Sequence, residues 1–181
     1  MSNVGPQHRS FAKIALDDLL RLARIARQDH QKFFQAHPDW ADLYRDRILA
    51  VTLCQGAAEH FLGGQRGIND FDLYTFYAAH PDRPWYAKRN KPWDYGDPKF
   101  GRTVDRPEFI GRRVDLLGRG IPYRDQEDIS IAIRRWLRTD RGKSSQLVAQ
   151  RPVVLIWPED RCGEVIWTPS VGSCPPKALF A

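Results

Sequence analysis

The segment Asp70–Ala78 has the sequence DFDLYTFYA, and it decides the fold. Its aromatic residues follow the turn-like residues 67–69, a pattern typical of a β-strand. Residues i and i+2 of a strand project from the same face, so Asp70 and Asp72 are expected side by side. The remaining positions on both faces are largely apolar. We therefore expect a sheet that is covered on both sides, with the two acids as exceptions.

The neighbouring segments predict a mixed α/β (α+β) domain. Ile48–Gln55 is an apolar run expected to form a buried strand, and Ala57–Leu62 is expected to form a short helix ended by two glycines. Arg112–Arg119, RRVDLLGR, predicts another strand with Asp115 near its centre. Residues 81–111 hold many prolines, glycines and aromatic residues without a clean period, which predicts a long irregular excursion.

Helices and a hairpin are expected at the two ends of the chain. Apolar residues recur at helical spacing from Ser10 to about Ala36, with Ser10 as N-cap and His37-Pro38 as the stop. The sequence thus predicts one domain over residues 1–181, in which a small mixed sheet is flanked by helices. Its expected parts are a core over about 48–118, an N-terminal helix over 10–36, and a C-terminal helix and β-hairpin over 125–168.

Composition narrows the class of protein. The 181 residues are 42% hydrophobic and 28% charged, which is the balance of a globular domain. No apolar stretch approaches the roughly 18 residues of a membrane span, and the N-terminus is polar. The three cysteines form no CxxC pair and leave an odd one, as expected in a reducing compartment. We expect a cytoplasmic protein without a membrane partner; the sequence leaves its oligomeric state open.

The net charge of +6 is concentrated in one stretch. Residues 83–124 hold 11 basic and 5 acidic residues, and the rest of the chain is balanced at 17 of each. Within this stretch, Pro84–Arg102 interleaves tryptophan, tyrosine and phenylalanine with lysine and arginine. Such a loop can stack on bases and contact phosphates. The alternatives are a solvated basic surface, and prolines and aromatic rings that fix a long loop to the core.

The paired acids predict a metal site. Adjacent carboxylates raise each other's pKa unless a cation lies between them. Asp115 on a neighbouring strand, about 4.8 Å away, could complete a cluster with Asp70 and Asp72. All-oxygen ligation favours Mg²⁺ or Mn²⁺ over zinc. The alternative is structural, because most Asp-x-Asp pairs are turns, caps or exposed strand ends. The scattered histidines give no HExxH motif, and no G-x-S-x-G is present.

The order of these motifs resembles the nucleotidyltransferase superfamily, which has the polymerase-beta-like fold, and most of all its small uncharacterised prokaryotic members. Gly56-Ala57 is followed by twelve residues and then by Asp70-Phe71-Asp72-Leu73, with Asp115 on a later strand. The resemblance covers about residues 48–118. It implies that Asp70 and Asp72 bind the metals that hold an NTP, and that Asp115 helps to activate an acceptor hydroxyl.

A nucleotide site follows from the same residues. Gly56 and Ala57 precede a helix, so their backbone could contact a phosphate. Ala57 stands where the family often has serine or glycine, and the missing hydroxyl removes a hydrogen bond worth about 1–3 kcal/mol. The cations expected to contact the triphosphate are Lys99, Arg102, Arg112 and Arg113.

These expectations amount to a Mg²⁺-dependent enzyme that transfers a nucleotidyl group from an NTP to a hydroxyl, for which RNA or a protein is a candidate acceptor. One alternative is a weak or inactive relative that binds nucleotide or RNA through the basic aromatic loop. Another is that the acids are structural and the basic stretch binds a protein partner.

Overall fold

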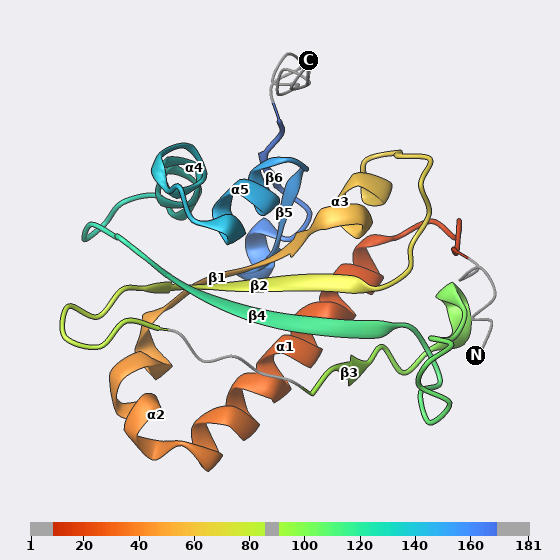
Figure 1. The fold of residues 1–181 in the computed structure, drawn as a ribbon, viewed down its shortest axis with the longest axis horizontal. Helices are drawn as coiled ribbons and strands as arrows, with labels where there is room; N and C mark the ends of the chain where they lie inside the picture. The colour runs from red at the N-terminus through yellow and green to blue at the C-terminus, as the bar shows by residue number, and fades with distance from the viewer. Residues whose placement is uncertain (1–8, 86–90, 170–181) are drawn as a thin grey trace, which may run out of the picture.

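The centre of the molecule is a six-stranded mixed sheet in the order β3-β4-β2-β1-β5-β6 (Figure 1). The computed structural model describes residues 9–85 and 91–169. β2 and β4 are parallel, and the other neighbouring strands are antiparallel. The strands are β1 Ile48–Cys54, β2 Phe71–Ala78, β3 Trp93–Asp94, β4 Arg113–Ile121, β5 Val153–Trp157 and β6 Val165–Trp167.

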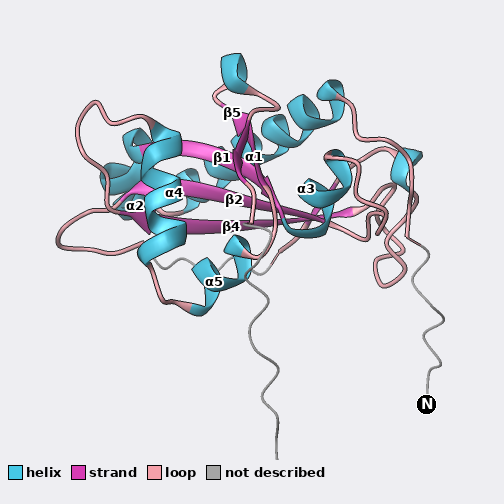
Figure 2. Ribbon diagram, turned by 90° about the horizontal axis from the view of Figure 1, so that it is seen from above, coloured by secondary structure: helices cyan, strands magenta, loops and turns pink. Residues whose placement is uncertain are grey.

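Helices cover both faces of this sheet. The α-helices are α1 Leu16–Ala36, α2 Pro38–Tyr44, α3 Gln55–Phe61, α4 Ile129–Thr139 and α5 Lys143–Ala149. α1 and α2 lie on one side of the sheet, and α3, α4 and α5 lie on the other (Figures 1 and 2). Short 3-10 helices occupy Arg45–Arg47, Pro98–Phe100 and Glu159–Arg161. None of the described helices is long and apolar enough to cross a bilayer.

Alternating residues of β2 pack into two separate hydrophobic cores, one on each face of the sheet. Phe71 and Leu73 pack with the apolar residues of α1. Tyr74 and Phe76 pack on the other face, where the Phe76 ring meets Trp136 of α4 at a centroid distance of 5.4 Å. The expected two-sided covering of the sheet is therefore confirmed. Asp72 belongs to the face of Tyr74 and Phe76, so it lies beneath α3 and α5 rather than against α1.

Most elements match the sequence prediction to within a few residues, but the start of the first helix was wrong. α1 begins at Leu16, and the Asp18 carboxylate accepts a hydrogen bond from the Ala15 N–H at 2.7 Å. Ser10 does not cap this helix; it pairs with Ile68 in an isolated β-bridge. The stop at His37-Pro38 and the C-terminal hairpin of β5 and β6 are confirmed. The sequence reading missed α5.

The excursion between β2 and β4 packs against the α1 and α2 face. Three of its rings are buried: Trp85, Tyr95 and Phe100. The Trp85 ring stacks on Tyr77 with a centroid distance of 4.0 Å, and Phe100 meets Phe71 edge-on at 5.3 Å. These rings cannot stack on a base without leaving the core, so they fix the loop to the domain. Tyr86, Lys88 and Arg89 of the same segment lie outside the described residues.

Candidate functional site

The strand register brings the acids together. Asp72 of β2 is the register partner of Asp115 on the parallel strand β4, and it is also opposite Cys54, the last residue of β1. Asp70 lies just before the first residue of β2. Because partners in a parallel ladder project from the same face, the Asp72 and Asp115 side chains share the face beneath α3 and α5.

Charge repulsion and burial act strongly on two of these carboxyl groups. Burial raises the pKa of Asp72 to about 7, and the negative charges of Asp70 and Asp115 add to the shift. Burial also raises the pKa of Asp70, with Asp115 contributing. Each shift means that the folded chain disfavours the ionised carboxylate. A cation placed between Asp70 and Asp72 would remove this penalty.

Asp115 has a partner of its own. Arg113, two residues earlier on the same face of β4, donates a hydrogen bond from Nε to Asp115 Oδ1 at 2.8 Å. Among residues 9–85 and 91–169, no three histidine, cysteine or acidic side chains are grouped so that they could hold one metal ion together. The structure therefore brings Asp70 and Asp72 to one site and engages the Asp115 carboxylate with Arg113.

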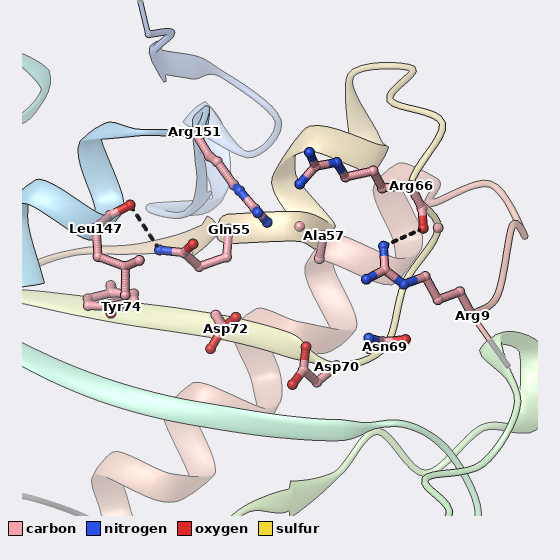
Figure 3. A pocket seen from close by; sticks show the side chains of 12 residues that line it. Arg9, Gln55, Ala57, Arg66, Asn69, Asp70, Asp72, Tyr74, Leu147 and Arg151 are labelled. Atoms are coloured by element: carbon pink, nitrogen blue, oxygen red, sulfur yellow. Dashed lines mark hydrogen bonds between the residues drawn. The ribbon is translucent and has the colours of Figure 1, made fainter. Parts of the chain in front are cut away.

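A pocket of about 250 Å³ opens over the two acids (Figure 3). Asp70 and Asp72 lie on the β2 side of the pocket. The rest of its lining comes from α3, α5 and the loops around these two helices. Its lining residues are Arg9, Gln55, Gly56, Ala57, Arg66, Gly67, Asn69, Asp70, Asp72, Tyr74, Leu147 and Arg151. The expected nucleotide-loop residues Gly56 and Ala57 thus line the same pocket as the two acids.

The turn from β1 into α3 shapes this pocket. Gln55 has a φ of 57°, in the left-handed region that residues other than glycine rarely occupy. Such a conformation costs about 1–3 kcal/mol and clusters at functional sites. The Gln55 side chain donates a hydrogen bond from Nε2 to the Leu147 carbonyl at 3.4 Å, which links α3 to α5 across the pocket (Figure 3).

The cations at the pocket are three arginines that the sequence did not single out. Arg9 donates a hydrogen bond from Nη1 to the Arg66 carbonyl at 3.0 Å, and the Ser10–Ile68 bridge fixes the N-terminal segment beside this loop. Arg151 follows α5, and its Nε lies 3.8 Å from Glu59 Oε2. The three arginines are far apart in the chain and share no motif, so only the tertiary structure brings them together.

The four cations expected at the triphosphate lie outside this pocket: Lys99, Arg102, Arg112 and Arg113. Lys99 forms an ion pair with Asp18 of α1, on the opposite side of the sheet. Arg112 is only 4% exposed, and its Nε donates to the Phe100 carbonyl at 2.6 Å. Arg102 is exposed. The buried rings of the excursion fix much of it to the α1 side of the sheet, away from the pocket.

The oxygen atoms in the pocket fit a divalent cation. Asn69 Oδ1 is buried and has no hydrogen-bond partner in the described part of the chain. It lines the pocket beside Asp70. Because this oxygen is buried, the acidic oxygen donors that face the pocket are the two carboxylates of Asp70 and Asp72. Carboxylates suit Mg²⁺ or Mn²⁺, and Mg²⁺ commonly needs only one or two of them when substrate phosphates complete its coordination.

Comparisons of the chain with protein-family models, with curated proteins and with solved structures found no match. The resemblance to nucleotidyltransferases therefore rests on the residues of the motif itself: Gly56-Ala57, Asp70, Asp72 and Asp115.

Proposed function

We propose that the protein is a metal-dependent nucleotidyltransferase, which moves a nucleotidyl group from an NTP to a hydroxyl acceptor. The observation that carries this proposal is the convergence of Asp70, Asp72 and the Gly56-Ala57 turn on one pocket, with Asp115 in register beside Asp72. This is the arrangement expected of a nucleotidyltransferase-like site, in which carboxylates face a backbone turn able to contact phosphate.

The three acids have two roles in this proposal. Asp70 and Asp72 would hold Mg²⁺ or Mn²⁺. The bound cation would supply charge neutralisation for the attacking and leaving oxygens. The acceptor hydroxyl oxygen forms a bond to the α-phosphorus while the bond to the pyrophosphate oxygen breaks, and pyrophosphate leaves with the electron pair. Asp115 would orient the acceptor hydroxyl and take its proton.

The test is a transfer assay with each α-³²P-labelled NTP, in Mg²⁺ or Mn²⁺, with total RNA and with the protein itself as acceptors. We expect label transfer by the wild type and none by Asp72→Asn. Asp42→Asn removes an exposed carboxylate on α2 and should leave transfer unchanged. Equal transfer by the Asp72→Asn protein would refute the proposal.

A second function is nucleotide binding without transfer. Two observations favour it: Ala57 supplies no hydroxyl to a phosphate, and Arg113 engages the Asp115 carboxylate. Because rings of the basic aromatic loop are buried, nucleotide would bind in the pocket rather than on that loop. This function predicts that an NTP raises the unfolding midpoint while no acceptor is labelled. If Asp72→Asn changes stability but neither binding nor transfer, the acids are structural.

A further inference from the structure

The pocket has two chemically different sides. Asp70 and Asp72 lie on β2, whereas Arg9, Arg66 and Arg151 come from three separate segments around α3 (Figure 3). Arg151 extends into the pocket from the segment after α5, and Arg9 approaches from the opposite end (Figure 3). The lining therefore combines three cationic and two anionic side chains. Such a site suits a ligand that is itself an anion carrying a divalent cation.

These three guanidinium groups retain unused hydrogen-bonding capacity. The Arg66 side chain is exposed and makes no hydrogen bond or ion pair within residues 9–85 and 91–169. Arg9 uses one nitrogen in its bond to the Arg66 carbonyl. Within the described residues, Arg151 forms the 3.8 Å ion pair with Glu59, and its charge also lowers the pKa of Asp72. By contrast, the Lys99 and Arg113 charges are paired with carboxylates.

Arg151 also lies close to the backbone of residue 56. A Cβ built on Gly56 would lie 3.4 Å from Arg151 Nη1. The guanidinium group therefore lies directly against the turn from β1 into α3, close to the Gly56-Ala57 backbone. A phosphate that enters the pocket on this side would meet Arg151, and planar guanidinium groups bind phosphate oxygens in a bidentate manner.

We infer that Arg9, Arg66 and Arg151 form a polyphosphate-binding cradle, and that the ligand of this pocket carries a chain of phosphates whose divalent cation faces Asp70 and Asp72. This inference rests on the proposed function in one respect, because only that proposal assigns a nucleoside to the ligand. Three arginines that enter one pocket from separate segments can contact more than one phosphate group, so the affinity should increase with the number of linked phosphates. Because the two aspartates repel a bare anion, binding should also require the divalent cation.

The test is titration calorimetry of the full-length protein with inorganic tripolyphosphate and pyrophosphate, in excess Mg²⁺ and in EDTA. We expect tripolyphosphate to bind more tightly than pyrophosphate, and to bind only with Mg²⁺. Arg66→Gln and Arg151→Gln should each weaken binding by about 10- to 100-fold, which is the loss of one hydrogen bond to a charged group. Arg102→Gln, which removes an exposed cation outside the pocket, should bind like the wild type.

Unchanged affinity in Arg66→Gln and Arg151→Gln would overturn the cradle, as would an equal loss in Arg102→Gln. Thermal unfolding of Arg66→Gln checks folding, because this side chain has no described partner to lose. The two proposals fail in distinguishable ways. Arginine-dependent tripolyphosphate binding without any label transfer would support the cradle and refute the transferase. Transfer with an unchanged KM for NTP in both arginine variants would support the transferase and refute the cradle.

Discussion

Replacing Asp72 by asparagine should stabilise the protein at alkaline pH and leave it nearly unchanged in acid. The pKa of Asp72 is raised from 3.8 to about 7, chiefly by burial and then by Asp70 and Asp115. A folded-state pKa above the unfolded value means that the folded chain favours the protonated carboxyl. The resulting stabilisation is fully present below pH 4 and is lost as the pH rises through 7.

The magnitude follows from the size of the shift. About three pKa units at 1.36 kcal/mol each give a penalty of up to about 4 kcal/mol on the wild type at pH 8. Asparagine has a similar shape and no charge, so Asp72→Asn avoids that penalty. In a domain of this size, 1 kcal/mol corresponds to roughly 2–4 °C in Tm. The variant should therefore melt up to about 8–16 °C above the wild type at pH 8.

The assay is thermal and urea unfolding of wild type, Asp72→Asn and Asp42→Asn at pH 4, 6 and 8, with and without Mg²⁺. The gap between Asp72→Asn and wild type should widen steadily with pH, whereas Asp42→Asn should follow the wild type. At pH 8, Mg²⁺ should stabilise the wild type more than Asp72→Asn, because the cation relieves the same repulsion. A gap that does not depend on pH would show that the Asp72 carboxyl is not under this electrostatic penalty.

Three further changes test other parts of the structure. Asn69→Ala should change stability by less than about 1 kcal/mol in urea unfolding, because Oδ1 has no described partner to lose; a larger loss would contradict this account of the amide. Gly118→Ala should destabilise the protein by about 1–3 kcal/mol in urea unfolding, since its Cβ would lie 2.0 Å from Trp85 Nε1; wild-type stability would contradict that packing. Burial lowers the pKa of His30 to about 4, so the neutral imidazole is favoured in the folded chain and the protein should lose up to about 3 kcal/mol of stability as the pH falls from 6.5 to 4. In His30→Gln this loss of stability in acid should disappear. A wild-type dependence of stability on pH in that variant would refute the prediction.

The sequence predicted those parts of the fold that depend on local periodicity. The apolar runs of β1, β2 and β4 and the helical spacing of α1 and α4 are properties of single segments, so a pattern of 2.0 or 3.6 residues identifies them. The start of α1 was wrong because Ser10 satisfies the local rule for an N-cap, while its backbone pairs with Ile68, 58 residues away. α5, KSSQLVA, is only seven residues long and is too short to show a clear apolar stripe.

The residues of the candidate site also fall into two groups: those that a local pattern predicts, and those that only the tertiary structure brings together. Asp70 and Asp72 are two residues apart, and strand periodicity was enough to predict that they lie together. Asn69 carried no signal of its own, since a single amide beside an acidic pair is unremarkable in a turn; its orphaned oxygen is visible only once burial is known. The pocket arginines could not be predicted from spacing, because Arg9 and Arg66 meet through a hydrogen bond from the Arg9 side chain to the Arg66 carbonyl, between distant segments.

The distribution of charge along the chain pointed to cations that lie outside the pocket, for a physical reason. Residues 83–124 carry the whole net excess of +6, yet the structure engages the charge of Lys99 with Asp18 and that of Arg113 with Asp115. The arginines that line the pocket come from the remainder of the chain, where acids and bases are equal in number. A count of residues cannot distinguish a cation that holds the fold together from one whose hydrogen bonds remain available. Affinity for an anion depends on cations of the second kind, so we expect the anion site where guanidinium groups with available hydrogen bonds converge, which in this chain is beside Asp70 and Asp72.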